Sequence, residues 1–328
     1  MISIRNVPIN PSTRVFVRGD LDVPIEGGNI LERYRLDSMF PTLSLLLEKQ
    51  AKIIIAGHVG KPNGRFVLEL STQQLLPYFN QQLGEGRFEL MENLRFDPRE
   101  EANDEEYAKE LASKADIYVN ECFSTCHRSH ASIVETPKFL PSYAGLRLEK
   151  EVKVLGGLLE NAQRPFVAII GGAKLEDKKP AVSKFLEIAN YVIIGGKIAL
   201  NWTDPKPKNL VAPTDYVPEF KDIGPNSIAK FKEIIQEAKT VLWAGPVGVY
   251  EEDEFFRGTK EIAQEIARIT AENNCFSVIG GGDTIAAVQK ANLINSFSFV
   301  STGGGAMLNF LVDGTLPGLQ ALNKDTND

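Results

Sequence analysis

Four apolar runs in the second half of the chain each end directly in two or three glycines. They are Phe166–Ile170 before Gly171-Gly172, Tyr191–Ile194 before Gly195-Gly196, 276–279 before Gly280-Gly281-Gly282, and 297–302 before Gly303-Gly304-Gly305. A strand that ends in glycine lets backbone N–H groups approach a ligand, because no Cβ stands in the way. Several such exits on one edge of a parallel sheet predict a crevice that binds the phosphates of a nucleotide.

Charged residues follow two of these glycine exits. Lys174 and Lys178 come directly after Gly171-Gly172, four residues apart at an expected helix start, and Asp283 follows the triple glycine 280–282. A solvated helix face would explain two such lysines, and a helix N-cap would explain the aspartate. Their position at the strand exits favours a role beside phosphate groups, since a surface pair has no reason to follow a strand and two glycines.

The first half of the chain places cations in turn-like positions: Arg18, Arg35, His58, Lys61, Arg95, His127, Arg128 and His130. Arg18 follows the strand expected at 15–17, His58 and Lys61 follow the run Lys52–Ala56, and Arg128 follows the run 117–119. Each of these residues alone would be read as a solvated surface charge. Loops at strand carboxyl ends are where such a fold builds its sites, so together they indicate a site for a small polyanion.

These residues need a scaffold of alternating strands and helices. Amphipathic patterns at 38–49 and 104–114 separate the strands of the first half, and 328 residues are enough for two cores. We expect an α/β protein with two Rossmann-like lobes, each with a parallel sheet, joined by an interdomain helix at Leu146–Asn161. The expected domains are 1–145 with a returning tail at 315–328, the helix 146–161, and 162–314.

Composition excludes several classes of protein. The net charge of −7 argues against a generally basic nucleic-acid binder, and no apolar run approaches the length that spans a bilayer. The N-terminus lacks the apolar stretch of a secretory signal, so we expect a cytoplasmic protein without a nucleic-acid or membrane partner. Cys122, Cys126 and Cys275 are too few for a disulfide framework, and Cys122-x3-Cys126-His127 lacks the spacing of a zinc site.

Ordered motifs along almost the whole chain resemble those of phosphoglycerate kinase. In the first half, 17–24 (VRGDLDVP) resembles V-R-x-D-F-N-V-P, 57–62 (GHVGKP) resembles S-H-L-G-R-P, 92–96 matches E-N-x-R-F, and 125–132 (TCHRSHAS) resembles T-A-H-R-A-H-A-S. In the second half, 171–178 (GGAKLEDK), 243–251 (WAGPVGVYE), 280–284 (GGGDT) and 301–305 (STGGG) resemble the corresponding family segments.

The resemblance implies reversible transfer of a phosphoryl group between 1,3-bisphosphoglycerate and ADP, with 3-phosphoglycerate and ATP as products. The N-terminal lobe would hold the triose acid through Asp20, Asp22, Arg35, His58, Lys61, Arg95 and Arg128. The C-terminal lobe would hold the Mg²⁺-nucleotide through Lys174, Lys178, Glu251, Gly280, Gly281, Gly282, Asp283, Thr284, Thr302 and Gly303. Asp283 would face the magnesium ion, and Glu251 would face the ribose.

Catalysis would then need positioning and charge stabilisation rather than a base, because the attacking carboxylate is already ionised at pH 7. Arg35 and Lys174 are the expected catalytic cations, and Gly281 and Gly304 the expected backbone donors. The helix Leu146–Asn161 would be the hinge of a closing movement. We expect a monomer whose partners are its small-molecule substrates.

The chain also departs from the family pattern. It is shorter at 71–91 and at 197–223, where the family has the wall of its adenine pocket, and Phe220 is hypothesised to stack on the base. Asp22 and Ala244 stand where the family has Asn, Lys61 where it has Arg, and Lys197 where it has Gly. The alternatives are a non-catalytic or weakened nucleotide-binding paralogue, and a kinase of another small carboxylic acid.

Overall fold

The computed structural model describes residues 1–205 and 207–323. The chain divides into two compact units. Unit one comprises Met1–Lys153 and the chain from Thr315 onward, and unit two comprises Val154–Gly314. Residues 324–328 of the tail expected at 315–328, and residue 206 of the stretch expected to be shortened, lie outside the described residues.

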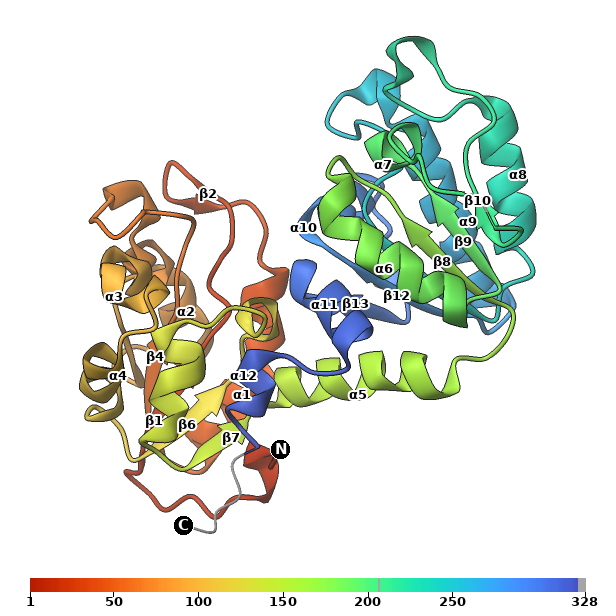
Figure 1. The fold of residues 1–328 in the computed structure, drawn as a ribbon. Coiled ribbons are helices and arrows are strands. Elements are labelled where there is room, and N and C mark those ends of the chain that lie inside the picture. Colours follow the sequence, from red (N-terminus) through yellow and green to blue (C-terminus); the bar gives the residue numbers. More distant parts are fainter. Residues whose placement is uncertain (206, 324–328) are drawn as a thin grey trace. The chain divides into compact units, whose positions relative to one another are not determined.

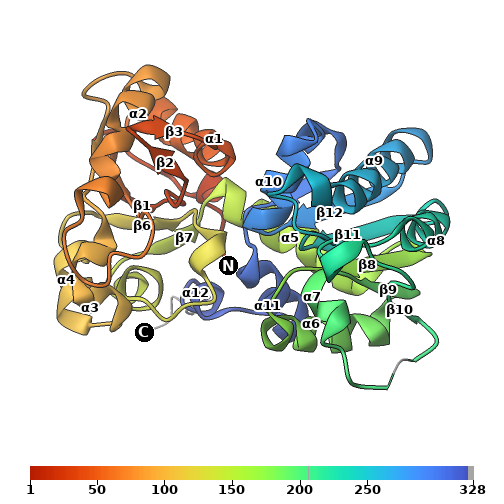
Figure 2. The ribbon, with the colours of Figure 1, turned by 90° about the horizontal axis from the view of Figure 1, so that it is seen from above.

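Unit one is built on a five-stranded sheet in the order β5-β4-β1-β6-β7, with parallel pairing along it. Its strands are β1 (Arg14–Arg18), β4 (Lys52–Ala56), β5 (Phe88–Leu90), β6 (Ile117–Asn120) and β7 (Ser142–Ala144), and β2 (Ile25–Glu26) pairs with β3 (Asn29–Ile30) in a separate hairpin. Its helices are α1 (Tyr34–Glu48), α2 (Leu76–Leu83), α3 (Pro98–Glu101), α4 (Glu105–Ala112) and α12 (Pro317–Gln320). In Figure 2, α1 and α2 lie on one side of this sheet and α3, α4 and α12 on the other.

Alternation along the strands explains these layers, because successive side chains point to opposite faces of a sheet. Val15 and Val17 of β1 join the core that also contains Leu36, Leu43 and Leu46 of α1. Phe16, between the two valines, instead stacks on Tyr118 of β6 with ring centroids 5.9 Å apart. Both faces of the sheet are therefore covered, as parallel sheets require.

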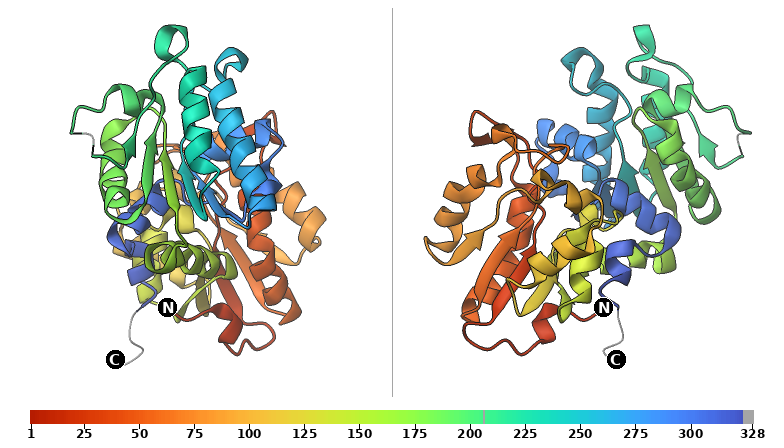
Figure 3. Two further views of the ribbon diagram at one scale, coloured as in Figure 1. Left: turned by 90° about the vertical axis from the view of Figure 1, so that its right-hand side faces the viewer. Right: turned by 60° about the vertical axis from the view of Figure 1, so that its left-hand side comes forward.

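Unit two has a six-stranded parallel sheet in the order β10-β9-β8-β11-β12-β13. Its strands are β8 (Phe166–Ile170), β9 (Tyr191–Ile194), β10 (Leu210–Val211), β11 (Thr240–Ala244), β12 (Phe276–Gly280) and β13 (Phe299–Ser301). Its helices are α6 (Leu175–Ile188), α7 (Gly196–Leu200), α8 (Pro225–Ile235), α9 (Arg257–Glu272), α10 (Gly282–Lys290) and α11 (Gly305–Asp313). The left panel of Figure 3 shows the strands between two sets of helices, with α8 and α9 together on one side.

The predicted α/β class with two parallel sheets is confirmed, while several predicted element ends shift. The expected strand at 297–302 shortens to Phe299–Ser301, and the helix expected at 104–114 shortens to Glu105–Ala112. The helix expected at 38–49 begins four residues earlier, at Tyr34, where the N-cap residue Arg33 makes no side-chain capping bond. An uncapped start leaves no capping signal in the sequence.

Helix α5 (Leu146–Asn161) contributes its first residues, up to Lys153, to unit one and the remainder to unit two (Figure 1). Its first turn is tied to β6 by Glu121, whose carboxylate accepts the backbone N–H of Arg147 at 3.1 Å. Thr42 of α1 donates its hydroxyl to Glu121 at 2.5 Å and accepts the N–H of Leu146 at 2.8 Å. Burial raises the pKa of Glu121 to about 7, and these hydrogen bonds limit the rise.

Candidate active site

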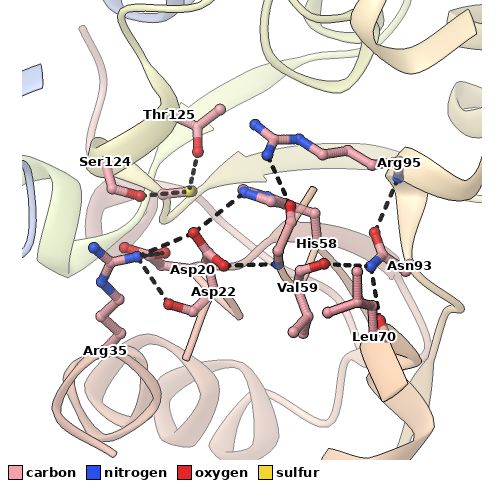
Figure 4. Close-up of polar contacts among 12 residues, drawn as sticks. Asp20, Asp22, Arg35, His58, Val59, Leu70, Asn93, Arg95, Ser124 and Thr125 are labelled. Atoms are coloured by element: carbon pink, nitrogen blue, oxygen red, sulfur yellow. Dashed lines mark hydrogen bonds and ion pairs between the residues drawn. The ribbon is translucent and has the colours of Figure 1, made fainter. Parts of the chain in front are cut away.

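In unit one, polar side chains gather where β1 and β4 end. Figure 4 shows Arg35 facing the carboxylates of Asp20 and Asp22, with His58 and Arg95 on the other side of Asp22. Asp20 and Asp22 follow β1 directly, His58 follows β4, and Arg35 lies in the first turn of α1. Parallel strands bring their carboxyl ends to one edge of the sheet, so residues far apart in sequence meet there.

The guanidinium of Arg35 is shared by two aspartates. Its Nη1 atom lies 3.6 Å from Asp20 Oδ1 and 3.6 Å from Asp22 Oδ2, and it donates to the backbone carbonyl of Asp22 at 2.9 Å. The charge of Asp20 raises the pKa of Arg35. Asp20 is only 1% exposed, and burial raises its pKa against the attraction of Arg35. Arg35 is thus held in place before any substrate binds.

Asp22 also fixes the loop that follows β4. Its Oδ1 atom accepts the N–H of Gly60 at 2.8 Å, and its Oδ2 atom lies 3.7 Å from His58 Nε2. Gly60 has φ +63°, a conformation that glycine adopts at low cost. Burial and the neighbouring charge of Arg18 lower the pKa of His58 well below its ordinary value. The His58 ring is therefore neutral near pH 7, and its contact with Asp22 is not an ion pair.

Arg18 lies behind this group rather than in it. The side chain is fully buried, and it donates to Ser132 Oγ at 2.7 Å and to the carbonyl of Gly19 at 2.5 Å. Its Nη2 atom lies 3.1 Å from His58 Nδ1. The expectation that Arg18 is one of the cations that contact the anion is therefore wrong, because its donors form hydrogen bonds within the fold. There Arg18 orients His58.

Arg95, Lys61 and Arg128 differ in how far they are engaged. Arg95 is 9% exposed, donates to the carbonyl of Gly60 at 3.0 Å and lies 3.3 Å from Glu101. Lys61 and Arg128 are exposed on the loops after β4 and β6, and neither side chain has a partner among the described residues. These two cations are therefore available to a ligand, whereas Arg95 is already anchored.

The other two histidines are also uncharged near neutral pH. Burial, with the charge of Arg128, lowers the pKa of His127 to about 4. Burial, with the charges of Arg95 and Arg18, lowers the pKa of His130 to about 3. The positive charge of this site therefore comes from arginine and lysine alone.

A buried glutamate that we did not predict supports this site. Glu100 is fully buried, accepts the hydroxyl of Ser132 at 2.5 Å and the N–H of Ser132 at 2.9 Å, and Ser132 in turn holds Arg18. Nothing in the surrounding sequence distinguishes Glu100 from the exposed acidic residues beside it. Only the fold reveals its role.

In unit two, three of the four predicted glycine exits, those after β8, β12 and β13, line a cavity of about 320 Å³, whereas Gly195 and Gly196 after β9 do not. It is lined by Gly171, Gly172, Ala173, Lys174, Asp177, Lys178, Gly245, Gly281, Gly282, Asp283, Thr284, Gly304 and Gly305. These residues follow β8, β11, β12 and β13, which are neighbours in one sheet. Ala173, Asp177 and Gly245 line it although they were not predicted as site residues; only their position within the family-like segments 171–178 and 243–251 could have indicated them.

Two of these turns pack so closely that only glycine fits. A Cβ on Gly171 would lie 2.1 Å from the carbonyl oxygen of Pro246, and one on Gly245 would lie 2.2 Å from the carbonyl oxygen of Gly171. Gly281 and Gly304 have φ of +102° and +49°, so an L side chain would be strained there. The glycines therefore serve both close packing and the opening of backbone toward the cavity.

Lys174 and Lys178 stand at the start of α6 on the wall of this cavity. Lys174 is exposed and is the N-cap residue of α6, and Lys178 is partly buried one turn later. Burial lowers the pKa of Lys178, while Asp283 and Asp177 oppose that effect. Thr284 accepts the N–H of Gly245 through its hydroxyl at 2.7 Å, which joins α10 to the turn after β11.

Three of the predicted nucleotide-binding residues lie behind the cavity wall. Gly280 ends β12, where a Cβ would lie 2.5 Å from the sulfur of Met307. Thr302 is 2% exposed, and Gly303 is buried and donates its N–H to Ser301 Oγ at 3.1 Å. The structure therefore brings Gly281, Gly282 and Asp283 to the cavity and keeps Gly280, Thr302 and Gly303 beneath it.

A second cavity of about 280 Å³ shares Gly172, Ala173 and Asp283 with the first. Glu251 and Tyr250 line it after β11, and Lys197 lines it from α7. Its apolar lining comes from Leu200, Pro246, Val249 and the ring of Phe220. The first cavity thus offers charged groups and glycine backbone, and the second adds apolar side chains beside the charged residues Lys197, Glu219, Lys221 and Glu251.

A magnesium ion that arrives with a nucleotide suits the first cavity. Asp283 is an exposed carboxylate beside Lys178, and Mg²⁺ is commonly held by one or two carboxylates together with phosphate oxygens and water. Among residues 1–205 and 207–323, no cluster of three or more His, Cys, Asp or Glu residues could hold a metal ion. In the same residues, no helix combines the length and the apolar character needed to cross a membrane.

Comparison with known proteins assigns the family. The sequence model of the phosphoglycerate kinase family matches residues 6–211 and 206–314. The chain belongs to the phosphoglycerate kinase family. It is an enzyme of the phosphotransferase class, and the activity shared by the family is phosphoglycerate kinase activity.

Relatives match over nearly their full length. The phosphoglycerate kinases of Leptospira biflexa and Pelotomaculum thermopropionicum are 38% and 34% identical, with 94% and 98% of this chain and 95% and 98% of theirs covered. The solved phosphoglycerate kinase structures from Coxiella burnetii and Pyrococcus horikoshii are 31% and 28% identical, with TM-scores of 0.82 and 0.85 and 98% coverage of both chains.

The comparisons also bear on the shortened segment. The alignment with the Leptospira relative extends over 380 residues, more than the 328 of this chain, so that relative carries insertions. The two ranges matched by the family model overlap at residues 206–211, which lie within the stretch 197–223 that we expected to be shortened. This stretch contributes Lys197, Leu200 and Phe220 to the second cavity.

Proposed function

We propose that the chain catalyses the reversible transfer of a phosphoryl group from 1,3-bisphosphoglycerate to ADP, with 3-phosphoglycerate and ATP as products. Unit one would bind the acid and unit two the Mg²⁺-nucleotide. The observation that carries this assignment is the glycine-lined cavity with Lys174 and Lys178, because backbone donors and cations at strand carboxyl ends suit a chain of phosphates.

In unit one, the acid would be bound by Asp20, Asp22, Arg35, His58, Lys61, Arg95 and Arg128. Arg35 and Arg128 would bind phosphate or carboxylate oxygens through their guanidinium forks, and exposed Lys61 would add a point charge. Neutral His58, held by Arg18, would donate or accept a hydrogen bond without adding charge. Asp20 and Asp22 would orient Arg35 and contact the substrate hydroxyl.

In unit two, Lys174 and Lys178 would contact the nucleotide phosphates and the phosphoryl group in transfer. The turns after β12 and β13 would supply backbone N–H donors at Gly281, Gly282 and Gly304, which line the cavity, while Gly280 and Gly303 would support these turns from beneath. Glu251 would bind the ribose, and Asp283 would face Mg²⁺. Thr284 would face the phosphates from the cavity wall, and Thr302 would hold its turn in shape from beneath.

The chemistry needs no general base, because the nucleophile is ionised at neutral pH in both directions: a β-phosphate oxygen of ADP in the direction named, and the carboxylate of 3-phosphoglycerate in the reverse. The transition state of phosphoryl transfer places charge on the equatorial oxygens, so the work of the protein is positioning and electrostatic stabilisation. Arg35 and Lys174 would stabilise that charge, and Gly281 and Gly304 would donate backbone N–H groups to it. Bound Mg²⁺ would neutralise part of the phosphate charge.

We further propose that α5 acts as the hinge, since its residues are divided between the two units. Transfer requires the two reactants to meet with water excluded, which closure would achieve.

We also propose a cytoplasmic monomer that takes only small-molecule substrates. A single species of the monomer mass in size-exclusion chromatography with light scattering would support the monomer, and a dimer would contradict it.

A kinase of another small carboxylic acid is the second candidate, because Asp22 brings a carboxylate to a site expected to bind an anion. Coupled turnover of 3-phosphoglycerate with Mg²⁺-ATP tests both proposals. Turnover with a KM far below that for other hydroxy acids would support the first. No turnover, together with no heat of binding for 3-phosphoglycerate, would overturn it, and turnover with a different acid would establish the second.

A further inference from the structure

The loop between Tyr216 and Ile223, which precedes α8, presents an aromatic ring to the second cavity of unit two. The two residues form an isolated antiparallel bridge that closes the loop. Phe220 lies within it, lines the cavity of about 280 Å³, and is 62% exposed. A large apolar side chain exposed at the mouth of a cavity is a candidate contact for a ligand.

The backbone of this loop is strained where it holds the ring. Glu219 has φ +63° and ψ +7°, and Phe220 has φ +55°. Non-glycine residues seldom adopt this left-handed conformation, and two in succession are rarer still. Such strain persists only where the surrounding structure imposes it, and it is found most often at functional sites.

Hydrogen bonds within and around the loop impose that conformation. Val217 donates its N–H to the carbonyl of Asp222 at 3.1 Å, and Phe220 donates to the carbonyl of Val217 at 3.1 Å. Val249, which also lines the cavity, donates its N–H to the carbonyl of Lys221 at 2.8 Å. The loop is therefore fastened to itself and to the segment that follows β11.

Side chains add four further contacts. Lys221 lies 3.1 Å from Glu219 and 3.2 Å from Glu252, and its ammonium group lies 4.7 Å from the ring centroid of Phe255. Asp222 is buried, and it accepts the N–H of Gly258 at 2.7 Å, which joins the loop to the start of α9. Phe220 is thus presented by a rigid loop rather than by a flexible one.

The surroundings of the ring suit a flat, apolar ligand group. Tyr216 contacts Phe220 with centroids 5.5 Å apart and ring planes at 62°, which fixes the Phe220 ring from one side. Leu200 and Val249 line the same cavity. The cavity joins the glycine-lined phosphate cavity through their shared residues, so a ligand that extends into both has phosphates at one end and a planar group at the other.

We infer that Phe220 is a preformed stacking platform for the nucleotide base. The inference rests on the proposed binding of nucleotide to unit two and adds the residue that holds the base. Aromatic stacking is tolerant of base identity, because every base has a π-face. The platform should therefore contribute similarly to the binding of ADP and of GDP.

Calorimetric titration of the full chain tests this with two ligands, Mg²⁺-ADP and Mg²⁺-tripolyphosphate, of which the second has no base. Phe220→Ala should raise the Kd of ADP about tenfold, equivalent to about 1.4 kcal/mol, and leave the Kd of tripolyphosphate within twofold of wild type. Phe220→Trp should keep the ADP affinity within twofold. Phe276→Ala is the matched control. Phe276 is also an exposed phenylalanine, but it begins β12 and so lies at the amino ends of the strands, away from their carboxyl ends.

An unchanged ADP affinity in Phe220→Ala would overturn the inference, as would equal losses for ADP and tripolyphosphate, or a loss for ADP without one for GDP. Should Phe220→Ala unfold at the assay temperature, Phe220→Leu replaces it, because leucine keeps apolar bulk and removes the ring. Turnover of 3-phosphoglycerate is measured separately. Its absence would count against the proposed function, while the binding comparison would still decide the role of Phe220.

Discussion

The candidate anion site of unit one is made of side chains, whereas that of unit two is made largely of backbone at glycine turns. In unit one, Arg35 is already paired with Asp20 and Asp22, and Arg95 with Glu101. In unit two, Gly171 and Gly245 pack backbone against backbone, and exposed Lys174 stands beside them. The first arrangement fixes Arg35 and Arg95 before the substrate arrives and leaves Lys61 and Arg128 unpaired among the described residues. The second leaves its donors and cations open to phosphate.

This difference predicts which substitutions should impair each site. A site built from paired side chains loses its geometry when one partner is removed, because the remaining charge is left buried. A site built from backbone is insensitive to most side-chain changes but depends on the few cations that enter it. Four predictions test this difference between the two units.

Lys174→Ala should have the largest effect. Because this cation is expected to meet the charge that develops in transfer, kcat should fall about 10³-fold, while the Kd of 3-phosphoglycerate stays within twofold. Coupled turnover and calorimetry measure the two quantities. Lys179→Ala is the matched control, since Lys179 pairs with Asp204 at 2.8 Å and does not line the cavity. Equal losses of turnover and acid binding in Lys174→Ala would contradict the assigned role.

Arg35→Ala should lower kcat/KM for 3-phosphoglycerate by about 10²-fold to 10³-fold, the usual cost of losing one preorganised donor. Nucleotide affinity should not change, because the residue belongs to unit one. Arg14→Ala serves as control at the other end of β1, where the arginine forms an exposed pair with Asp116 at 2.6 Å. If Arg35→Ala weakened nucleotide binding as strongly as acid turnover, the separation of roles between the units would fail.

The pH dependence of stability compares one buried carboxylate in each unit. Burial raises the pKa of Glu121 to about 7 and that of Asp222 to about 6. A raised pKa means that the folded state holds the proton more tightly than the unfolded chain. The contribution of Glu121 to stability should therefore fall by about 3 kcal/mol as pH rises from about 4.5 to 7.

Urea unfolding at several pH values measures this effect as the difference between wild type and Glu121→Gln. The difference for Asp222→Asn should develop at lower pH, between about 4 and 6. Both tryptophans, Trp202 and Trp243, belong to unit two, so their fluorescence follows that unit, and circular dichroism follows the whole chain. Differences that do not vary with pH would show that these carboxylates titrate normally.

Asp22→Asn should have the smallest effect. Removal of one negative charge near an anionic substrate should lower the KM of the acid about fivefold, equivalent to about 1 kcal/mol. The amide oxygen can still accept the N–H of Gly60, so the loop should keep its shape. A higher KM would instead show that the carboxylate binds the substrate hydroxyl.

The parts of the fold and site that the sequence predicts well are those with a local signal. Apolar runs that end in glycine predicted β8, β9 and β12, because the residues that form the strand and those that form the turn are adjacent in the sequence. The same glycines pointed to Gly281 and Gly304, which line the cavity. Lys174 and Lys178 were found for the same reason, since they adjoin a glycine pair.

What the sequence could not predict depends on neighbours that are distant along the chain. Arg18 was expected among the anion-binding cations, but Ser132 and His58 occupy its donors in the fold. Short strands such as β5 and β7 gain their pairing from the sheet rather than from their own composition. The left-handed backbone of Glu219 and Phe220 also left no local sign, because neither residue type favours that conformation.

Burial, reinforced by neighbouring arginine charges, has a consequence for the histidines of unit one. His58, His127 and His130 are all three imidazoles of the chain, and each has a pKa lowered below its ordinary value. Acidification from pH 7 toward pH 6 would therefore add no positive charge from these three imidazoles to the candidate acid site, and their hydrogen-bond roles would stay the same.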